Sequence, residues 1–293
     1  MISRSASEPS PENAESRPDV TVAILTLNEE ANLPQALRSV CGWARAVVVL
    51  DSGSQDRTKE IALSFGARVT ENAFKDFATQ RNFALRSAGI ETEWVFFLDA
   101  DEWMPSPLRS EIDGVVSSQP QEDGFLLRRR LIWMGHWVRR GYYPTWLLRL
   151  VRRSRASCEA RGVNEHLVVE GRIGHLREDL IHEDRKSLTE WAAKQVRYAE
   201  AEALLLCAER SHATKPPLST QAGRKRWLRE KVWVHLPPVA RAFVYFGYRY
   251  VLRLGFLEGL AGLSFHFLQG LWLQVLIDLR YLELRRSRRG GGP

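Results

Sequence analysis

The chain has 293 residues, 44% of them hydrophobic, which is enough to bury one large domain and a smaller appendage. Its formal net charge is +7, but the segment from Lys215 onward holds 14 Lys and Arg against 4 Asp and Glu. That segment is therefore +10, which leaves about −3 for the rest. The basic character belongs to the C-terminal part alone, where we expect an anionic partner, and it gives no information about the substrate of the N-terminal part.

The N-terminal residues and the cysteines bear on the cellular compartment. Residues 1–18 are rich in Ser, Glu and Pro, so we expect a disordered tail that lacks the apolar core of a secretory signal. The three cysteines, Cys41, Cys158 and Cys207, lie far apart and are odd in number, which argues against a disulfide framework. The sequence therefore predicts a cytoplasmic protein.

From Val20 onward, short apolar runs alternate with amphipathic stretches. Strands are predicted at TVAILTL, AVVVLDS, ARVTEN and EWVFFLDAD, and helices over 29–40, 55–65 and 77–88. This order is typical of an α/β protein with a mostly parallel sheet, in which ligands bind beyond the carboxyl ends of the strands. The residues that follow each strand are thus the first candidates for a functional site.

Three of these strand ends carry acidic and amide side chains. They are residues 26–30 after the first strand, 51–58 after the second and 99–102 after the fourth. In the first two loops, Asn28 and Ser54 are explained equally well as helix N-caps. In the third, Asp99 and Asp101 follow a buried strand and repel each other unless a cation intervenes. This favours a Mg²⁺ or Mn²⁺ ion held by these two residues, with phosphate oxygens and water completing its shell.

Together these segments resemble a known family. The runs LTLNEEANLPQALRSV, DSGSQDRT, FATQRNFAL and FFLDADEW are similar to the nucleotide-binding half of inverting family 2 glycosyltransferases, and most similar to the lipopolysaccharide core branch. The resemblance is strong over residues 20–102 and extends more loosely to about 182. It implies a GT-A-like, Rossmann-type sheet that binds a nucleotide diphosphate sugar, with a UDP-linked sugar as the expected donor.

The resemblance also implies roles for single residues. In order along the chain, the base and ribose pocket would be lined by Thr26, Asn28 and Glu29, and the nucleoside contacted by Asp51. Arg81 would lie near the base or diphosphate, Asp99 near the ribose, and Asp101 would hold the metal ion as the last residue of a DxD motif. Ser52 departs from the family pattern, in which many members carry a second acid, and this bears on the nucleotide contacts but not on the fold.

An inverting displacement also needs a base on the face of the sugar opposite the diphosphate. We predict Glu165 for this role because the resemblance would put an acceptor-side acid there; the alternative is a solvated surface acid. His166 and His182 are more typical of hydrogen-bonded structural residues, although either is able to complete a metal shell.

Aromatic and basic residues gather in the segment between these sites. Residues 133–137 and 142–146 fit either stacking on an acceptor sugar or the filling of a core beneath a long loop. Arg149 is predicted to contact the diphosphate. The arginines at 128–130, 139 and 140 either bind an anionic acceptor or form a solvated face.

The C-terminal part has a different composition. We expect the sheet domain over 19–210, a linker over 211–235 and a basic, amphipathic helical region over 236–293. The stretch 259–277 is about long enough to span a bilayer, but polar residues interrupt it and acids flank it. We therefore predict a helix that lies in the membrane interface, with the terminal arginines drawn to the anionic leaflet on the cytoplasmic side. Packing on the catalytic domain and a dimer contact are the alternatives.

These features predict a metal-dependent hexosyltransferase acting on a lipid-linked or lipopolysaccharide core-type glycan at the inner face of the cell membrane. One sugar per encounter is expected, because Gln221 and Arg224 lack the Trp that completes the Gln-x-x-Arg-Trp motif of processive synthases. A catalytically inactive, nucleotide-sugar-binding membrane adaptor and a polyprenyl-phosphate glycosyltransferase are the alternatives. Nucleic-acid binding is disfavoured, because the C-terminal arginines alternate with a large apolar face.

Overall fold

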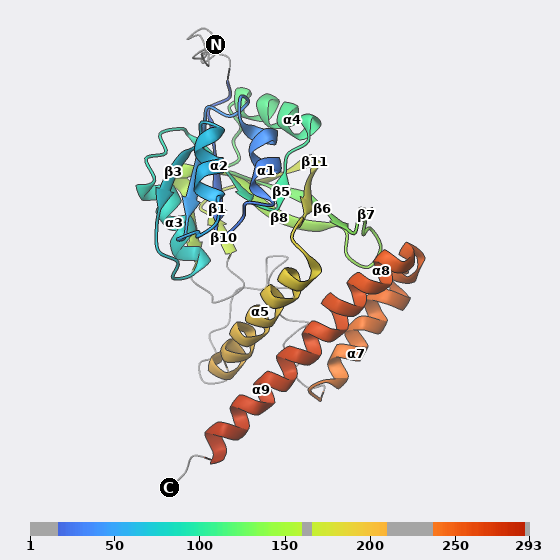
Figure 1. The fold of residues 1–293 in the computed structure, drawn as a ribbon. Helices are drawn as coiled ribbons and strands as arrows, with labels where there is room; N and C mark the ends of the chain where they lie inside the picture. The colour runs from blue at the N-terminus through green and yellow to red at the C-terminus, as the bar shows by residue number, and fades with distance from the viewer. Residues whose placement is uncertain (1–16, 160–165, 210–236, 291–293) are drawn as a thin grey trace, which may run out of the picture. The chain divides into compact units, whose positions relative to one another are not determined.

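The computed structural model describes residues 17–159, 166–209 and 237–290 (Figure 1). They divide into two compact units. The first holds the residues up to Arg129, those from 145 to 159 and those from 166 to 185; the second holds Arg130–Pro144 and the described residues from Lys186 onward. The expected linker 211–235 and most of the expected tail 1–18 lie outside the described residues, so the domain boundaries stay predictions.

The first unit is built on a mixed sheet with the strand order β3-β2-β1-β4-β8-β6-β11-β5. The parallel strands are β1 (Val20–Thr26), β2 (Ala46–Asp51), β3 (Arg68–Glu71) and β4 (Trp94–Asp99). The antiparallel strands are β8 (Thr145–Arg152), β6 (Gly124–Trp133), β11 (Ile173–Glu183) and β5 (Glu102–Trp103). β7 (His136–Trp137) pairs with the end of β6, and β9 (Ala156–Glu159) pairs separately with β10 (His166–Val169).

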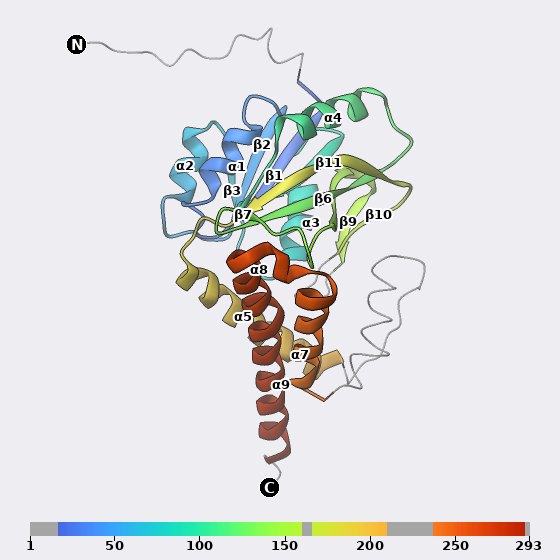
Figure 2. The same cartoon turned by 90° about the vertical axis from the view of Figure 1, so that its right-hand side faces the viewer.

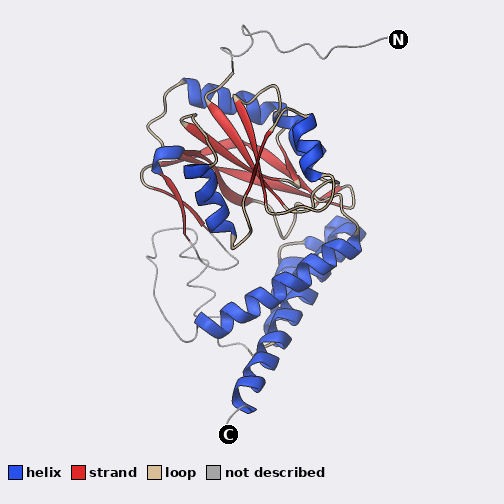
Figure 3. Cartoon of the chain, turned by 60° about the vertical axis from the view of Figure 1, so that its left-hand side comes forward, coloured by secondary structure: helices blue, strands red, loops and turns tan. Residues whose placement is uncertain are grey.

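Helices pack on both faces of this sheet (Figures 1 and 3). They are α1 (Leu33–Val40), α2 (Thr58–Ser64), α3 (Phe77–Ser87) and α4 (Ser106–Ser117). The four predicted strands and three predicted helices are confirmed. The first helix begins at Leu33 rather than Glu29, because the intervening residues form a turn in which the Leu33 N–H donates to the Glu29 carbonyl at 2.8 Å.

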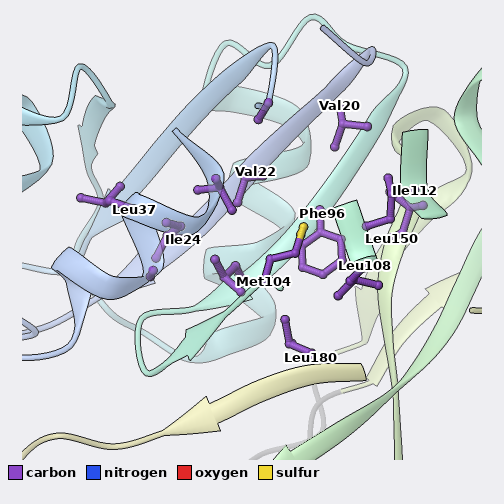
Figure 4. Close-up of a cluster of buried hydrophobic side chains, with 14 of the residues drawn as sticks. Val20, Val22, Ile24, Leu37, Phe96, Met104, Leu108, Ile112, Leu150 and Leu180 are labelled. Carbon is purple, nitrogen blue, oxygen red and sulfur yellow. The ribbon is translucent and has the colours of Figure 1, made fainter. Parts of the chain in front are cut away.

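Alternate residues of the central strands point into two cores. Val22 and Phe96 pack in the larger core with α1 and α4 (Figure 4), whereas Val95 and Phe97 pack on the other face, against Leu85 of α3. Burial on both faces explains why these strands read as continuous apolar runs.

The second unit is mainly helical. Its elements are α5 (Leu188–Glu209), α7 (Ala240–Gly247), η4 (Tyr248–Leu252), η5 (Gly255–Glu258), α8 (Gly259–Phe265), η6 (His266–Trp272) and α9 (Leu273–Gly290). α5 lies alongside α9 (Figures 1 and 2), with Ala199 packed near Leu273 and Ala203 near Tyr281. One continuous helical stretch, Gly255–Ser287, is long and apolar enough by length and composition to cross a membrane.

Two buried polar residues tie the loop Arg130–Pro144 to these helices. Arg249 Nε donates to the Gly141 carbonyl at 3.1 Å, and its Nη1 donates to Gln269 Oε1 at 2.5 Å. His266 is fully buried, with Nε2 at 3.1 Å from the Arg140 carbonyl oxygen. Burial, with a further contribution from the Arg249 charge, lowers the pKa of His266 to about 4.

Mild acid is therefore expected to destabilise the second unit. The unfolded chain protonates His266 near its ordinary pKa of 6.5, whereas the folded chain does so only near 4. The free energy of unfolding should fall as the pH drops from about 6.5 toward 4, by up to about 3 kcal/mol. Thermal unfolding measured over this range should show a smaller loss in His266→Gln than in the parent. An equal loss in both proteins would contradict the assignment.

Candidate functional site

The site lies at the carboxyl edge of the parallel strands. β1 is the central strand, so its end meets the ends of both neighbours: Thr26 is paired with Asp51, and Leu25 with Asp99. The three acidic loops of the sequence therefore converge on one edge, as the parallel order requires.

The loops after β1 and β2 are joined by side-chain hydrogen bonds. The Asn28 N–H donates to Ser54 Oγ at 2.8 Å, and the Gln55 N–H donates to Asn28 Oδ1 at 2.8 Å. The N-cap positions of α1 and α2 are instead occupied by Asn32 and Arg57. The helix-cap alternative for Asn28 and Ser54 is thus wrong. Asn28 has a φ of 54°, a left-handed conformation that Asn tolerates.

Asp51 is fully buried at the end of β2. Its Oδ1 accepts hydrogen bonds from the N–H groups of Gly53 and Ser54 at 3.0 and 2.8 Å. Its Oδ2 accepts from Thr26 Oγ1 at 2.9 Å and from Ser54 Oγ at 2.5 Å. In this arrangement Asp51 and the buried Thr26 fix the loop that carries Ser54, and their contacts with a nucleoside remain predictions.

Three consecutive residues of α3 contact three different parts of the unit. Gln80 Nε2 donates to Ser52 Oγ at 3.2 Å, so the residue that departs from the family pattern has a defined partner. Arg81 Nη2 lies 3.5 Å from Asp99 Oδ1. Asn82 forms two hydrogen bonds with the backbone of β9, at 2.7 and 2.9 Å. The segment FATQRNFAL thereby links the β2 loop, the end of β4 and β9.

The carboxylates after β4 are neutralised by arginines of the chain itself. Arg149 on β8 is only 5% exposed. Its Nη2 donates to Asp99 Oδ2 at 2.5 Å and to Glu102 Oε1 at 2.7 Å, and its Nη1 donates to Asp99 Oδ1 at 3.2 Å. Arg81 adds a contact to Asp99, and Arg129 Nη1 lies 3.4 Å from Glu102 Oε1. Part of the repulsion from which a metal ion was inferred is thus relieved by guanidinium groups.

Burial opposes ionisation of both carboxyl groups, with different outcomes. For Asp99, the charges of Arg149 and Arg81 outweigh burial and hold its pKa well below the ordinary range. For Glu102, burial outweighs Arg149 and raises its pKa above the ordinary value. Asp99 therefore stays ionised at neutral pH, and its side chain is 34% exposed, so it is able to accept hydrogen bonds from a ligand.

Asp101 and His182 form the other part of the site. His182 Nε2 lies 3.4 Å from Asp101 Oδ2, and both side chains are largely buried. The Glu183 N–H donates to the Asp101 carbonyl at 2.9 Å, which fixes β11 beside the loop after β4. Among the described residues, His182 Nδ1 is one of the buried nitrogens that have no hydrogen-bond partner.

This pair fits a divalent metal ion. A carboxylate suits Mg²⁺ and Mn²⁺, and an imidazole nitrogen is a further possible ligand. The two atoms lie 3.4 Å apart, so they would approach by a few tenths of an ångström to reach the roughly 3.0 Å between neighbouring octahedral ligands with bonds of about 2.1 Å. No three His, Cys, Asp or Glu side chains form a complete metal site within the described part of the chain, so phosphate oxygens and water would supply the other ligands. Asp99 would first have to exchange its guanidinium partners, which makes Asp101 the better placed of the two predicted ligands.

Glu29 lies at the same edge of the sheet, where the buried Asn32 binds its side chain. Asn32 Nδ2 donates to Glu29 Oε2 at 2.9 Å and to Asp184 Oδ1 at 3.0 Å. The Arg185 N–H donates to Asn32 Oδ1 at 2.7 Å. The loop after β1 and the segment after β11 are thereby held together, next to the strand end that carries His182.

The arginines of β6 are separated by the alternation of the strand. Arg129 points to Glu102, whereas Arg128 Nε donates to Asp179 Oδ1 at 2.8 Å and its guanidinium carbon lies 5.7 Å from the ring centre of Trp146. Arg129 and Glu102 were not predicted from the sequence as parts of the site. The available signal was the strand period of two, which places Arg129 on the opposite face from its neighbours.

The predicted base is not tested by the structure. Glu165 lies outside the described residues, as does the side chain of His166. Its catalytic role stays a prediction.

Comparisons with known proteins agree with this fold. Residues 21–110 match the family described as Glycosyl transferase family 2. A 192-residue stretch is 29% identical to the lipopolysaccharide core biosynthesis glycosyltransferase LpsC of Rhizobium meliloti (strain 1021), covering 61% of this chain and 68% of that protein. An uncharacterized glycosyltransferase of Rickettsia bellii (strain RML369-C) is 35% identical over 103 residues, which are 35% of this chain and about a third, 34%, of the relative.

Among solved structures, the chain is similar to the mannosyltransferase PcManGT from Pyrobaculum calidifontis, determined in complex with GDP-Man and Mn²⁺. The TM-score is 0.50 at 16% identity, over 92% of this chain and 88% of that one, and at this identity the likeness bears on the fold. The fold is therefore of the GT-A type. Within it, residues 21–110 are similar to the family 2 glycosyltransferases, as the resemblance of the motifs implied.

Removal of Arg149 tests the charge balance of the site. Arg149→Met should destabilise the first unit by about 3–5 kcal/mol, because it leaves Asp99 and Glu102 without their main cation. Adding Glu102→Gln should recover part of that loss, with a coupling of about 1 kcal/mol or more in a double-mutant cycle measured by urea unfolding. Arg57→Met, which breaks an exposed pair with Glu60, serves as the control and should leave stability nearly unchanged, because solvent screens this pair. Purely additive losses would show that Arg149 does not balance Glu102.

Proposed function

We propose that the chain transfers one hexose, with inversion, from a nucleotide diphosphate sugar to a glycolipid or lipopolysaccharide core-type acceptor at the cytoplasmic face of the membrane. A UDP-linked sugar is the expected donor, and the reaction depends on Mg²⁺ or Mn²⁺. The observation that carries the proposal is the arrangement after β4, where Asp101 faces His182 next to an Asp99 that two arginines keep ionised.

The donor-binding roles follow from exposure and charge. Asp99 would accept hydrogen bonds from the ribose hydroxyls, while Arg149, which is buried, would act by holding Asp99 in place rather than by contacting the diphosphate directly. Asp101 and His182 would hold the metal ion. When bound, that ion neutralises the negative charge that develops on the leaving diphosphate.

The acceptor side needs a proton acceptor. As the acceptor oxygen forms its bond to the anomeric carbon, the bond to the diphosphate breaks on the opposite face, and Glu165 would take the proton of the attacking hydroxyl. Support for this assignment comes from the resemblance to the family and not from a described contact.

Three observations support an envelope acceptor at the membrane face. The relative from Rhizobium meliloti is named for lipopolysaccharide core biosynthesis. The C-terminal segment from Lys215 onward is strongly basic, which suits an anionic lipid surface. The helical stretch Gly255–Ser287 is apolar enough to meet lipid.

Donor chemistry is tested by nucleotide release. UDP-, GDP- and ADP-sugars are incubated with the full chain and Mn²⁺, Mg²⁺ or a chelator, in the presence of acceptor glycolipid. We expect release from one class of donor, loss of release with chelator, and a drop of about 100-fold or more in Asp101→Ala, because the metal ligand is removed.

The matched control is Asp113→Asn, which removes a carboxylate charge on α4 but keeps an acceptor for the Trp43 indole N–H. It should release nucleotide at the parent rate. Release that is indifferent to metal and to Asp101 would overturn the metal-dependent mechanism.

A second test separates the transferase from a nucleotide-sugar-binding adaptor. Glu165→Gln should lower turnover by about 100-fold or more while leaving donor affinity within a factor of about two, because the base acts on the acceptor only. Affinity is measured by calorimetry and turnover by product formation. Donor binding without product in the parent itself would favour the adaptor, and unchanged turnover in the variant would remove Glu165 from the mechanism.

A further inference from the structure

Several polar residues in or next to the C-terminal apolar stretch are bonded within the second unit. Glu258 is largely buried and lies 2.6 Å from His136 Nε2, and its other oxygen accepts from the Arg140 N–H at 2.9 Å. Gln269 accepts from the buried Arg249, and His266 is fully buried. Glu258, His266 and Gln269 are therefore bonded within the unit, and none of the three is exposed.

Asp278, the acid at the end of the stretch, is neutralised in the same way. It is buried, accepts from the Val239 N–H at 2.8 Å and forms an ion pair with Arg241. Polar groups paired within a helical unit no longer oppose its transfer into an apolar medium, because the cost of that transfer arises from unsatisfied groups.

The outer surface of the segment 240–272, which we call the hairpin, is almost entirely apolar. Of the twenty large hydrophobic residues that are exposed in the described chain, eleven lie within residues 243–267. They are Phe243, Val244, Tyr248, Val251, Leu252, Leu254, Phe256, Leu257, Leu260, Leu263 and Phe267. Arg253 is the one exposed charged residue in this range of the described structure, and a long side chain of this kind is able to reach lipid headgroups from an apolar surface.

The packing of α5 argues against a helix that crosses the bilayer. Ala199 of α5 packs near Leu273 and Ile277, and Ala203 near Tyr281, so α5 covers the second half of the candidate spanning stretch. α5 carries exposed charges at Glu190, Arg197 and Glu200, which do not suit hydrocarbon.

Chain connectivity gives the same result. α5 begins at Leu188, three residues after the first unit ends at Arg185. Ala199 is eleven residues further on, a helical rise of about 16 Å, whereas the hydrocarbon core is about 30 Å thick. Because Ala199 packs near Leu273, a spanning stretch would draw this part of α5, with the exposed charges of Arg197 and Glu200, into the hydrocarbon.

We propose that the hairpin inserts its apolar outer surface into the acyl layer of one membrane leaflet, and that the chain is held there without crossing the membrane. Headgroup contacts of Arg253 and of the exposed Arg286 near the end of α9 add to this attachment. The occupant is lipid rather than a second copy of the chain, because the exposed residues described for the hairpin are apolar apart from Arg253 and the Tyr248 hydroxyl, whereas a protein interface usually carries a polar rim.

Vesicle flotation tests the insertion. The full chain is mixed with phosphatidylcholine vesicles, with and without phosphatidylglycerol, at low salt and at about 1 M salt, where charge attraction is screened within about 3 Å. We expect flotation with neutral vesicles that persists at high salt. The double variant Leu252→Glu/Leu260→Glu, at positions 73% and 74% exposed, should float at least 10-fold less.

The control carries the same number of new charges at exposed leucines outside the hairpin. Leu63→Glu/Leu279→Glu changes positions that are 62% and 52% exposed and should float like the parent. Flotation that requires anionic lipid and is abolished by salt would overturn insertion in favour of surface attraction. A parent that does not float, and that is a dimer which the hairpin variant dissociates, would overturn it in favour of a second copy.

Sidedness separates insertion from spanning. With the chain added to sealed vesicles, an external protease should remove the residues after Ser287 and thus change the mass of the protein. Protection of that terminus would show that the chain crosses the membrane. The proposal is independent of the transfer chemistry: with an acceptor glycolipid dispersed in detergent, the hairpin variant should still release nucleotide like the parent, so failure of one proposal leaves the other standing.

Discussion

The contact on which the site depends is the buried guanidinium group of Arg149 between Asp99 and Glu102. Arg149 belongs to β8, the first antiparallel strand, whereas Asp99 ends β4, the last parallel one. The junction of the two halves of the sheet is therefore also the place where the charge of the site is balanced. Because Asp99 already has its counterion, a bound metal ion would need to compensate mainly Asp101 and the phosphates. The order of the strands in the sheet therefore determines which charged groups meet in the site.

Much of the fold of the first unit could be predicted from the sequence, because strands buried on both faces leave continuous apolar runs such as WVFFLD and the loops between them are polar. The antiparallel half was harder to predict. β6 and β8 carry arginines, at 128–130 and at 149, that look like a solvated face until their buried partners are known. When a strand buries an arginine against a carboxylate that is distant in the sequence, the residues around that arginine do not indicate that it is buried.

The same limit applies to the site. The acids after β4 were identified, and a metal ion was inferred to neutralise them. Sequence distance hid the fact that Arg149, fifty residues away from Asp99, supplies part of the neutralising charge. The caps expected at Asn28 and Ser54 proved to be links between two loops, since each side chain bonds across to the other loop rather than to its own helix. In the C-terminal part, the sequence suggested that Glu258 and Asp278 interrupt the apolar surface. Their partners, His136 and Arg241, lie elsewhere in the chain, so this pairing could not be predicted from the local sequence.

The three consecutive residues of α3 have a consequence for how the protein is able to change. Gln80, Arg81 and Asn82 each hold a different part of the first unit, and each depends on its angle around the helix axis. Insertion or deletion of one residue ahead of them would turn all three by about 100°, so all three links would be lost together. A change in the length of this helix would therefore disrupt the first unit at three places at once, whereas exchange of one of these side chains would remove a single link.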